Sequence, residues 1–253
     1  VPSPPPTLAD MPAKPKGANW AEPATVVDRM TFRFDGGGYL PTGNQQVFVV
    51  PADGGTPRQM TSGDYPISGS VSWMPDSQSI VFSSNRRENV EYHPRQNDLY
   101  AASMTTGELT QMTDHAGPEG NPAVSPNGRY LAYTSAADTR QGYNRADLRV
   151  MDLASGESRS LTADLDRSVS DIQWSGDSKS VWIRYNDLGM ARIAEVDLKG
   201  DLKQADIVLG GTALGRPYTS GTFSVGGKDR IAYTLGRDDR PADLALMLSG
   251  KQP

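Results

Sequence analysis

An eleven-residue pattern recurs three times along this chain of 253 residues. It reads SWMPDSQSIVF at residues 72–82, AVSPNGRYLAY at 123–133 and QWSGDSKSVWI at 173–183, with a weaker copy at 224–233. Pro75 and Pro126 lie 51 positions apart, and the matching turn of the next copy follows 50 positions later. A fixed period of this length indicates a repeat protein in which each repeat is one supersecondary unit.

A second motif keeps the same period and recurs in phase with the first. Each copy opens on an apolar stretch, passes through a glycine turn and ends at a threonine, in residues 47–61, 98–113 and 147–162. The closing threonines, Thr61, Thr113 and Thr162, are 52 and 49 positions apart. Two motifs that share one period make a stronger repeat signal than either motif alone.

Each motif predicts a β-hairpin. Asp, Asn, Ser and Gly at the turns tolerate the positive φ that tight turns need, and the flanking residues are β-branched, aromatic or alternating. Two hairpins per repeat give four strands, which is one blade of a β-propeller. A single blade leaves both faces uncovered, so neighbouring blades must pack face to face. We therefore predict an all-β fold, a β-propeller of four-stranded antiparallel blades, with Trp73, Phe82, Tyr133, Trp174 and Ile183 between blades.

The period also predicts the domain boundaries. Residues 1–24 are rich in proline and are expected to form a linker or loop. The blades are expected at about 25–61, 62–113, 114–162, 163–204 and 205–253, with Gly36–Gly38 as a flexible turn in an irregular first blade. The last repeat stops in the turn before its closing strand, so about five blades and an incomplete, open ring are expected.

Composition narrows the function classes. Glycine (26) and proline (19) are frequent, which favours short strands and turns over helices. The net charge is −5 with acids and bases interspersed, so no basic face for nucleic acid is expected, and no apolar run is long enough for a membrane helix. The chain has no cysteine, which excludes a disulfide framework and cysteine-ligated zinc. This slightly favours a cytoplasmic over a periplasmic address and leaves the compartment open.

No catalytic motif is present. The chain lacks the Gly-x-Ser-x-Gly pentapeptide that presents a serine nucleophile on a strand–turn–helix elbow. Its two histidines, His93 and His115, fall in predicted loops and have no motif partner. We therefore expect no catalytic residue, no cofactor and no metal site.

The repeats resemble the WD-like blades of the prolyl oligopeptidase family and of the periplasmic Tol-system propeller. A closer resemblance, to bacterial dipeptidyl aminopeptidases and acylaminoacyl-peptidases of the same family, covers nearly the whole chain. It is carried by residues 34–43, 49–59, 164–169, 214–218 and 239–244.

This resemblance implies a non-catalytic propeller that gates and positions peptide substrates for a C-terminal α/β-hydrolase domain of the same parent chain. The parent would then be a serine peptidase, and its partners would be that domain and peptides. The alternative is a stand-alone platform that binds proteins, as the Tol-system propeller does. A reading frame that continues into Gly-x-Ser-x-Gly would favour the peptidase.

One charged segment, Arg86–Tyr92, is a candidate substrate-binding site. Some dipeptidyl peptidases hold the free amino terminus of a substrate with propeller glutamates, because carboxylate–ammonium pairs form strong charge-assisted hydrogen bonds. The candidates here are Arg86, Glu88 and Glu91, although the two acids are separated by two residues rather than adjacent. A solvated charged loop is the structural alternative.

Overall fold

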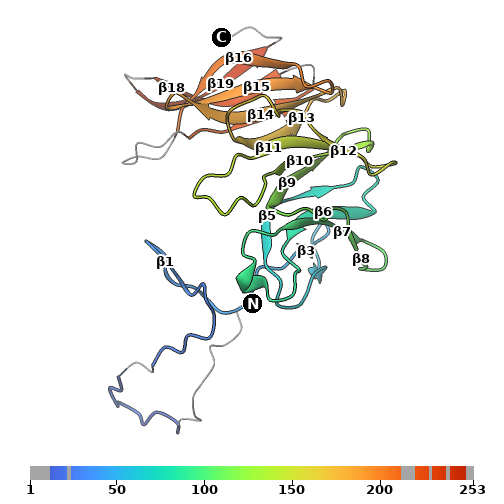
Figure 1. The fold of residues 1–253 in the computed structure, drawn as a ribbon. Helices are drawn as coiled ribbons and strands as arrows, with labels where there is room; N and C mark the ends of the chain where they lie inside the picture. The colour runs from blue at the N-terminus through green and yellow to red at the C-terminus, as the bar shows by residue number, and fades with distance from the viewer. Residues whose placement is uncertain (1–11, 22–23, 212–219, 228–229, 238–239, 249–253) are drawn as a thin grey trace.

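The computed structural model describes residues 12–21, 24–211, 220–227, 230–237 and 240–248. These residues form nineteen strands and one short 3-10 helix, η1 at Val90–Tyr92. In Figure 1 the strands build flat sheets that follow one another from the N-terminal to the C-terminal part of the chain. No helix within these ranges is long and apolar enough to cross a membrane.

Three complete blades are each built from four consecutive antiparallel strands. Blade 2 comprises β5 (Ile67–Trp73), β6 (Ser79–Ser84), β7 (Asp98–Ser103) and β8 (Leu109–Gln111). Blade 3 comprises β9 (Glu119–Val124), β10 (Tyr130–Ser135), β11 (Asp147–Asp152) and β12 (Ser158–Ser160). Blade 4 comprises β13 (Val169–Trp174), β14 (Ser180–Asp187), β15 (Met190–Asp197) and β16 (Leu202–Leu209). The predicted four-stranded antiparallel blades are therefore confirmed.

Blade 5 contains three strands within the described residues: β17 (Phe223–Gly226), β18 (Arg230–Arg237) and β19 (Arg240–Leu248). Strand β16 crosses the expected limit of blade 4 at residue 204 and runs on to Leu209. One register pair, Leu209 with Leu235, connects its end to β18. Residues 1–11 of the expected linker, the resemblance segment 214–218 and the expected turn at Ser249–Gly250 lie outside the described residues.

The first sequence motif forms the turn between the two inner strands of each blade. In each turn a side-chain oxygen accepts a hydrogen bond from the backbone N–H two residues later. The acceptors are Asp76, Asn127 and Asp177, at 2.9, 3.0 and 3.1 Å. The next residue has a left-handed backbone, with φ of 59°, 71° and 61° at Ser77, Gly128 and Ser178. These turns need short polar residues or glycine, which explains the recurring pattern.

The second motif places a threonine hydroxyl on a buried backbone N–H. The Oγ1 atoms of Thr61, Thr113 and Thr162 each accept a hydrogen bond of 2.9 Å, from the N–H groups of Val47, Leu99 and Leu148. The donor lies within one residue of the start of the third strand of its repeat, and the acceptor follows the fourth strand. The motif therefore closes the outer hairpin of each repeat.

Residues 25–61 differ from the predicted irregular blade. They form two separate hairpins, β1 (Arg33–Phe34) with β2 (Gly38–Tyr39), and β3 (Phe48–Val49) with β4 (Arg58–Gln59), instead of one four-stranded sheet. The β3–β4 hairpin packs Val47 and Met60 against Ile80 and Phe82 of blade 2. The β1–β2 hairpin projects away from the stack in Figure 1 and exposes Phe34. The two hairpins are separated because blade 2 covers apolar side chains of only one of them.

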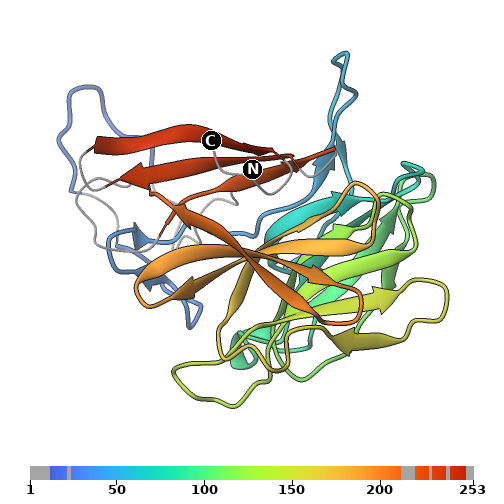
Figure 2. The same ribbon diagram turned by 90° about the horizontal axis from the view of Figure 1, so that it is seen from above.

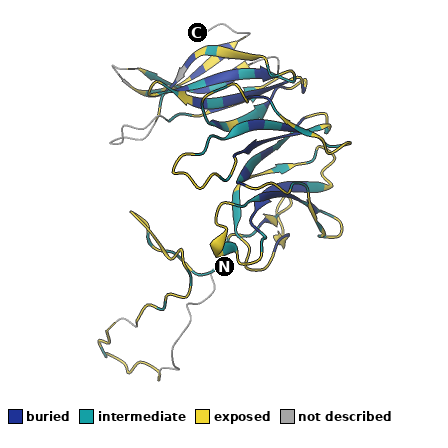
Figure 3. Cartoon of the chain, in the orientation of Figure 1, coloured by how far each residue is buried: buried dark blue, intermediate teal, exposed yellow. Residues whose placement is uncertain are grey.

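The hydrophobic core lies between the sheets. One apolar cluster fills each junction between successive blades, and another lies between the β3–β4 hairpin and blade 2. Figure 3 shows this as buried strand centres flanked by exposed turns, and Figure 2 shows the sheets fanning around a common region. Among the described strands, none of blade 5 pairs with β1–β4, so the row of sheets is open, as predicted.

Candidate functional site

The segment predicted to bind substrate connects β6 to β7 at one end of blade 2. It carries Arg86, Glu88 and Glu91, and it includes η1, which begins after Asn89 in a left-handed conformation with φ of 55°. Arg86 is half-buried, whereas Glu88 and Glu91 are exposed.

Arg86 is held by aromatic side chains. Its guanidinium carbon lies 4.2 Å from the ring centroid of Tyr65 and 5.8 Å from that of Tyr100. Its Nη1 atom is buried and has no hydrogen-bond partner among the described residues. Cation–π contacts of this kind orient the guanidinium while leaving N–H groups free for an anionic or carbonyl acceptor.

The two glutamates differ in what they contact. Glu91 Oε1 accepts a hydrogen bond of 3.0 Å from the backbone N–H of Met30, which connects this loop to the N-terminal segment. For Glu88 no hydrogen bond or ion pair occurs within the described ranges. The structure thus places the three candidates on one loop without a direct contact that joins them, and their role in substrate binding remains a prediction.

An arginine of this loop, Arg87, pairs with two aspartates, one of them buried, and this ion pair was not singled out from the sequence. The Arg87 guanidinium contacts Asp98 at 3.0 Å and Asp114 at 2.7 Å. The Asp98 side chain is only 1% exposed, and its other oxygen accepts the His115 backbone N–H at 3.1 Å. Burial raises the pKa of Asp98, and the hydrogen bond from His115 and the charge of Arg87 oppose that shift. The ion pair anchors the loop to blade 2.

Glu119, at the start of β9, is a second buried carboxylate. It is 4% exposed, and its Oε2 atom lacks a hydrogen-bond partner among the residues that the structure describes. Burial raises its pKa, against the opposing effects of hydrogen bonds with Thr113 and Ser135 and the charge of His115. The described ranges contain no cluster of three acidic or histidine side chains that could hold a metal ion.

A row of left-handed residues lies in the innermost strands of blades 2 to 4 and just before that of blade 5. We call Gly69, Asn121, Asp171 and Gly221 the bulge row; their φ values are 70°, 51°, 45° and 123°. Their spacings of 52, 50 and 50 positions repeat the period of the two motifs. The register shifts at the first three, so each forms part of a β-bulge. In the sequence, the recurrence of glycine, asparagine or aspartate at this spacing is the signal that could have predicted these bulges.

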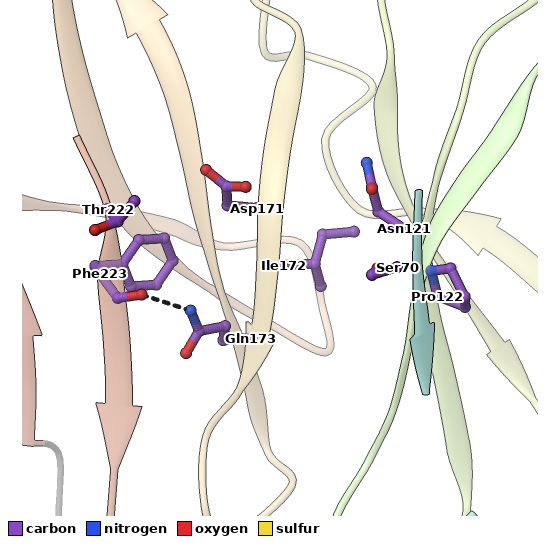
Figure 4. A pocket seen from close by; sticks show the side chains of 8 residues that line it. All are labelled: Ser70, Asn121, Pro122, Asp171, Ile172, Gln173, Thr222 and Phe223. Carbon is purple, nitrogen blue, oxygen red and sulfur yellow. Dashed lines mark hydrogen bonds between the residues drawn. The ribbon is translucent and has the colours of Figure 1, made fainter. Parts of the chain in front are cut away.

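A pocket of about 250 Å³ lies along the bulge row. Its lining comes from the innermost strands or the residues beside them: Ser70, Asn121, Pro122, Asp171, Ile172, Gln173, Thr222 and Phe223. Figure 4 shows Asn121 and Asp171 on neighbouring strands with their side chains pointing the same way. Arg184 Nε contacts Asp171 at 2.6 Å, and its Nη1 donates to the Gly221 carbonyl at 2.9 Å.

Comparison with known proteins agrees with this architecture. Residues 20–141, just under half of the chain, match the family described as "Dipeptidyl peptidase IV (DPP IV) N-terminal region". Dipeptidyl-peptidase 5 of Porphyromonas gingivalis is 31% identical over 139 residues, which cover 53% of this chain and 20% of that protein. The chain thus aligns with about a fifth of this curated relative.

Two solved structures share the fold at lower identity. Puromycin hydrolase superimposes with a TM-score of 0.61 and 17% identity, covering 85% of this chain and 35% of that one. TolB from Acinetobacter baumannii superimposes with a TM-score of 0.59 and 21% identity, covering 82% and 47%. The chain is therefore similar over residues 20–141 to the N-terminal region of dipeptidyl peptidase IV, and it shares the β-propeller fold of these solved structures.

Proposed function

We propose that this chain is the non-catalytic propeller portion of a serine peptidase, and that it gates and positions peptides for an α/β-hydrolase domain of the same polypeptide. The observation that carries the proposal is the match of residues 20–141 to the N-terminal region of dipeptidyl peptidase IV. The sequence itself contains no Gly-x-Ser-x-Gly nucleophile motif, so the chemistry would belong to the other domain.

The test uses the longer reading frame of the parent gene. We expect it to continue into Gly-x-Ser-x-Gly followed by an aspartate and a histidine. The purified polypeptide should then cleave short peptides faster than folded or long ones, and deletion of residues 25–253 should reduce this discrimination by size. A reading frame without a hydrolase domain, or unchanged size selection after deletion, would contradict the proposal.

Within this function, we propose that the loop with Arg86, Glu88 and Glu91 contacts the end of the substrate. Arg86 offers a free buried N–H, and Glu88 an exposed carboxylate without an internal partner. In the intact enzyme, Glu88→Gln and Glu91→Gln should each raise KM for substrates with a free amino terminus and leave acetylated substrates unaffected. Glu108→Gln, in an exposed turn of the same blade, is the matched control. Unchanged KM values would remove this loop from the site.

The second candidate function is a protein-binding platform, which the structural likeness to TolB favours. That likeness is at 21% identity and concerns the fold. One set of measurements, of partner binding and of hydrolysis, distinguishes the two functions. A platform should bind a protein partner through the propeller alone and show no hydrolysis in any longer form of the polypeptide.

A further inference from the structure

The innermost strands are edge strands, and side chains of adjacent blades form hydrogen bonds with some of their backbone N–H and C=O groups. β5, β9 and β13 each lie at the end of the strand order of their sheet. Edge strands present backbone N–H and C=O groups that no neighbouring strand pairs. Side chains of adjacent blades bond four backbone groups of β9 and β17. Ser72 Oγ accepts the Val124 N–H, and Trp174 Nε1 donates to the Ala123 carbonyl. The Gln173 amide donates to the Phe223 carbonyl and accepts the Val225 N–H.

These contacts lie on one side of the bulge row, toward the turns between inner strands. At the bulge row, the register between the innermost strand and its neighbour in the same sheet is interrupted. The register joins Ala132 to Ala123 and Thr134 to Gly120, so Asn121 is without a paired residue. Asp171 is skipped in the same way, between Ser170 and Ile172. The pocket therefore lies at the bulges of the innermost strands.

Two of the polar side chains that line the pocket, Asn121 and Asp171, keep an acceptor oxygen without a hydrogen bond within the described residues. The Asn121 amide nitrogen donates to Thr134 Oγ1 at 3.3 Å, which leaves its carbonyl oxygen free to accept. Asp171 uses one carboxylate oxygen on Arg184, and its other oxygen has no hydrogen bond within the described residues. The Arg184 cation balances the charge of Asp171, so the pocket suits neutral N–H donors more than a second cation.

Apolar surface lies beside these acceptors. Ile172 and Phe223 belong to adjacent inner strands and line the same pocket, and Phe223 is 7% exposed. Figure 4 shows both side chains alongside the polar ones. A row of acceptors next to apolar side chains matches the two kinds of surface that an extended peptide presents, its amide N–H groups and its side chains.

We propose that the bulge-row pocket binds an extended peptide through its main-chain N–H groups, with a small apolar side chain against Ile172 and Phe223. This inference rests on the proposed function, in which peptides reach the propeller, and it identifies where they are held. Asn121 and Asp171 are the acceptors, and Arg184 positions Asp171 by pairing with it.

The experiment is an NMR titration of the 253-residue chain with capped penta-alanine and with its counterpart methylated on every amide nitrogen. The variant Asn121→Gly/Asp171→Gly removes both acceptors and keeps residues that tolerate positive φ. Leu188→Gly is the matched control, because Leu188 is also left-handed, at φ 47°, lies in blade 4 and is 83% exposed.

We expect penta-alanine to shift the amide signals of the bulge row and the double variant to bind about tenfold more weakly, as for the loss of one or two hydrogen bonds. The control should bind within about twofold of the wild type, which is the scatter expected away from the site. The N-methylated peptide should not shift the bulge row.

Three results would overturn the inference: no shift at the bulge row, equal affinity of the double variant, or equal binding of the N-methylated peptide. If peptide binds elsewhere on the chain, the proposed function stands and only this site is rejected. The proposed function fails separately, through the reading frame or the size selection of the longer polypeptide.

Discussion

Two junctions between blades differ in their chemistry: the junction between blades 3 and 4, and the junction between blades 2 and 3. The first is filled by an apolar cluster that includes Trp174, Ile183 and Val196. The second has a smaller apolar cluster, with Leu99, Leu131 and Tyr133 among its members, and it is bordered by the buried carboxylates of Asp98 and Glu119. The comparison teaches that the same repeat can form a junction without buried carboxylates or one whose buried carboxylates make its stability depend on pH. Four predictions test this difference, from the largest expected effect to the smallest.

Trp174 should contribute most to the apolar junction. It is 8% exposed, stacks on Tyr130 with ring centroids 6.1 Å apart, and donates its indole N–H to the Ala123 carbonyl at 2.8 Å. Trp174→Ala should lower the free energy of unfolding by about 3–5 kcal/mol, as for other buried aromatic truncations. Trp73 matches it in the repeat but is 45% exposed, so Trp73→Ala should cost less than about 1 kcal/mol. Urea denaturation measures both, and equal losses would contradict the comparison.

Gly117 should be the most constrained backbone position near the mixed junction. Its φ is +147°, and an added Cβ would lie 2.0 Å from the Ala136 carbonyl oxygen, on the loop of the same blade. Gly117→Ala should therefore destabilise the chain by about 2–3 kcal/mol, since a backbone segment must shift. Gly156→Ala is the control, at φ +75° with no atom within 4 Å, and should cost about 1 kcal/mol. A smaller loss at Gly117 than at Gly156 in thermal unfolding would refute this ranking.

The threonine hydroxyls should contribute similarly wherever they occur. Thr162→Val removes the acceptor of the Leu148 N–H in the apolar junction, and the expected loss is about 1–2 kcal/mol because a buried donor is left unpaired. Thr61→Val should cost about the same, since its bond to Val47 is also 2.9 Å and buried. Chemical denaturation of the two variants and of the double variant tests whether the contributions add. A loss at one site only would show that the motif is not equivalent between repeats.

Glu119 should make the mixed junction sensitive to pH. Its pKa is raised above the ordinary value of 4.5 because burial disfavours the charged form. The folded state therefore binds the proton more tightly than the unfolded state. This contribution to stability is present below pH 4.5 and is lost as the pH rises through the folded pKa. Asp98, whose pKa is also raised by burial, acts in the same direction.

Glu119→Gln should remove this loss. Relative to the wild type, the variant should gain stability as the pH rises from 4 to 8, because it keeps a neutral side chain where the wild type buries a charge. The difference between the two proteins is the informative quantity, because Asp152, Asp177 and Asp197 have lowered pKa values and affect both proteins alike. Thermal unfolding across this pH range measures it. A difference that does not vary with pH would show that Glu119 is not a titrating group of this junction.

The sequence predicted the repeat unit well because period and turn chemistry are local. The left-handed residues at Ser77, Gly128 and Ser178 follow from short polar turns, and the threonine bonds follow from a motif of about fifteen residues. The first repeat was predicted less well. Residues 25–61 contain apolar and glycine-rich segments that suit strands, but only the β3–β4 hairpin finds a surface to cover it. Which hairpin packs against the stack depends on contacts with blade 2, and the local sequence contains no signal for those contacts.

The candidate site shows the same division. The charged loop with Arg86, Glu88 and Glu91 was visible as a run of residues, but its connection to Met30 and to the rings of Tyr65 and Tyr100 depends on segments distant in sequence. The bulge row was present in the sequence at the same period as the blades. Its meaning appears only when four inner strands lie side by side, because a single left-handed residue in one strand forms no pocket.

By itself, the sequence determined the four-stranded unit, its period of about fifty residues and the turns that close it. These depend on backbone preferences within each hairpin. The tertiary structure decided which apolar faces are covered, where carboxylates such as Glu119 become buried, and how Asn121 and Asp171 come to line one pocket. Burial and juxtaposition depend on neighbouring blades, and their physical effect, the desolvation of charge and apolar surface, exists only after those blades have packed.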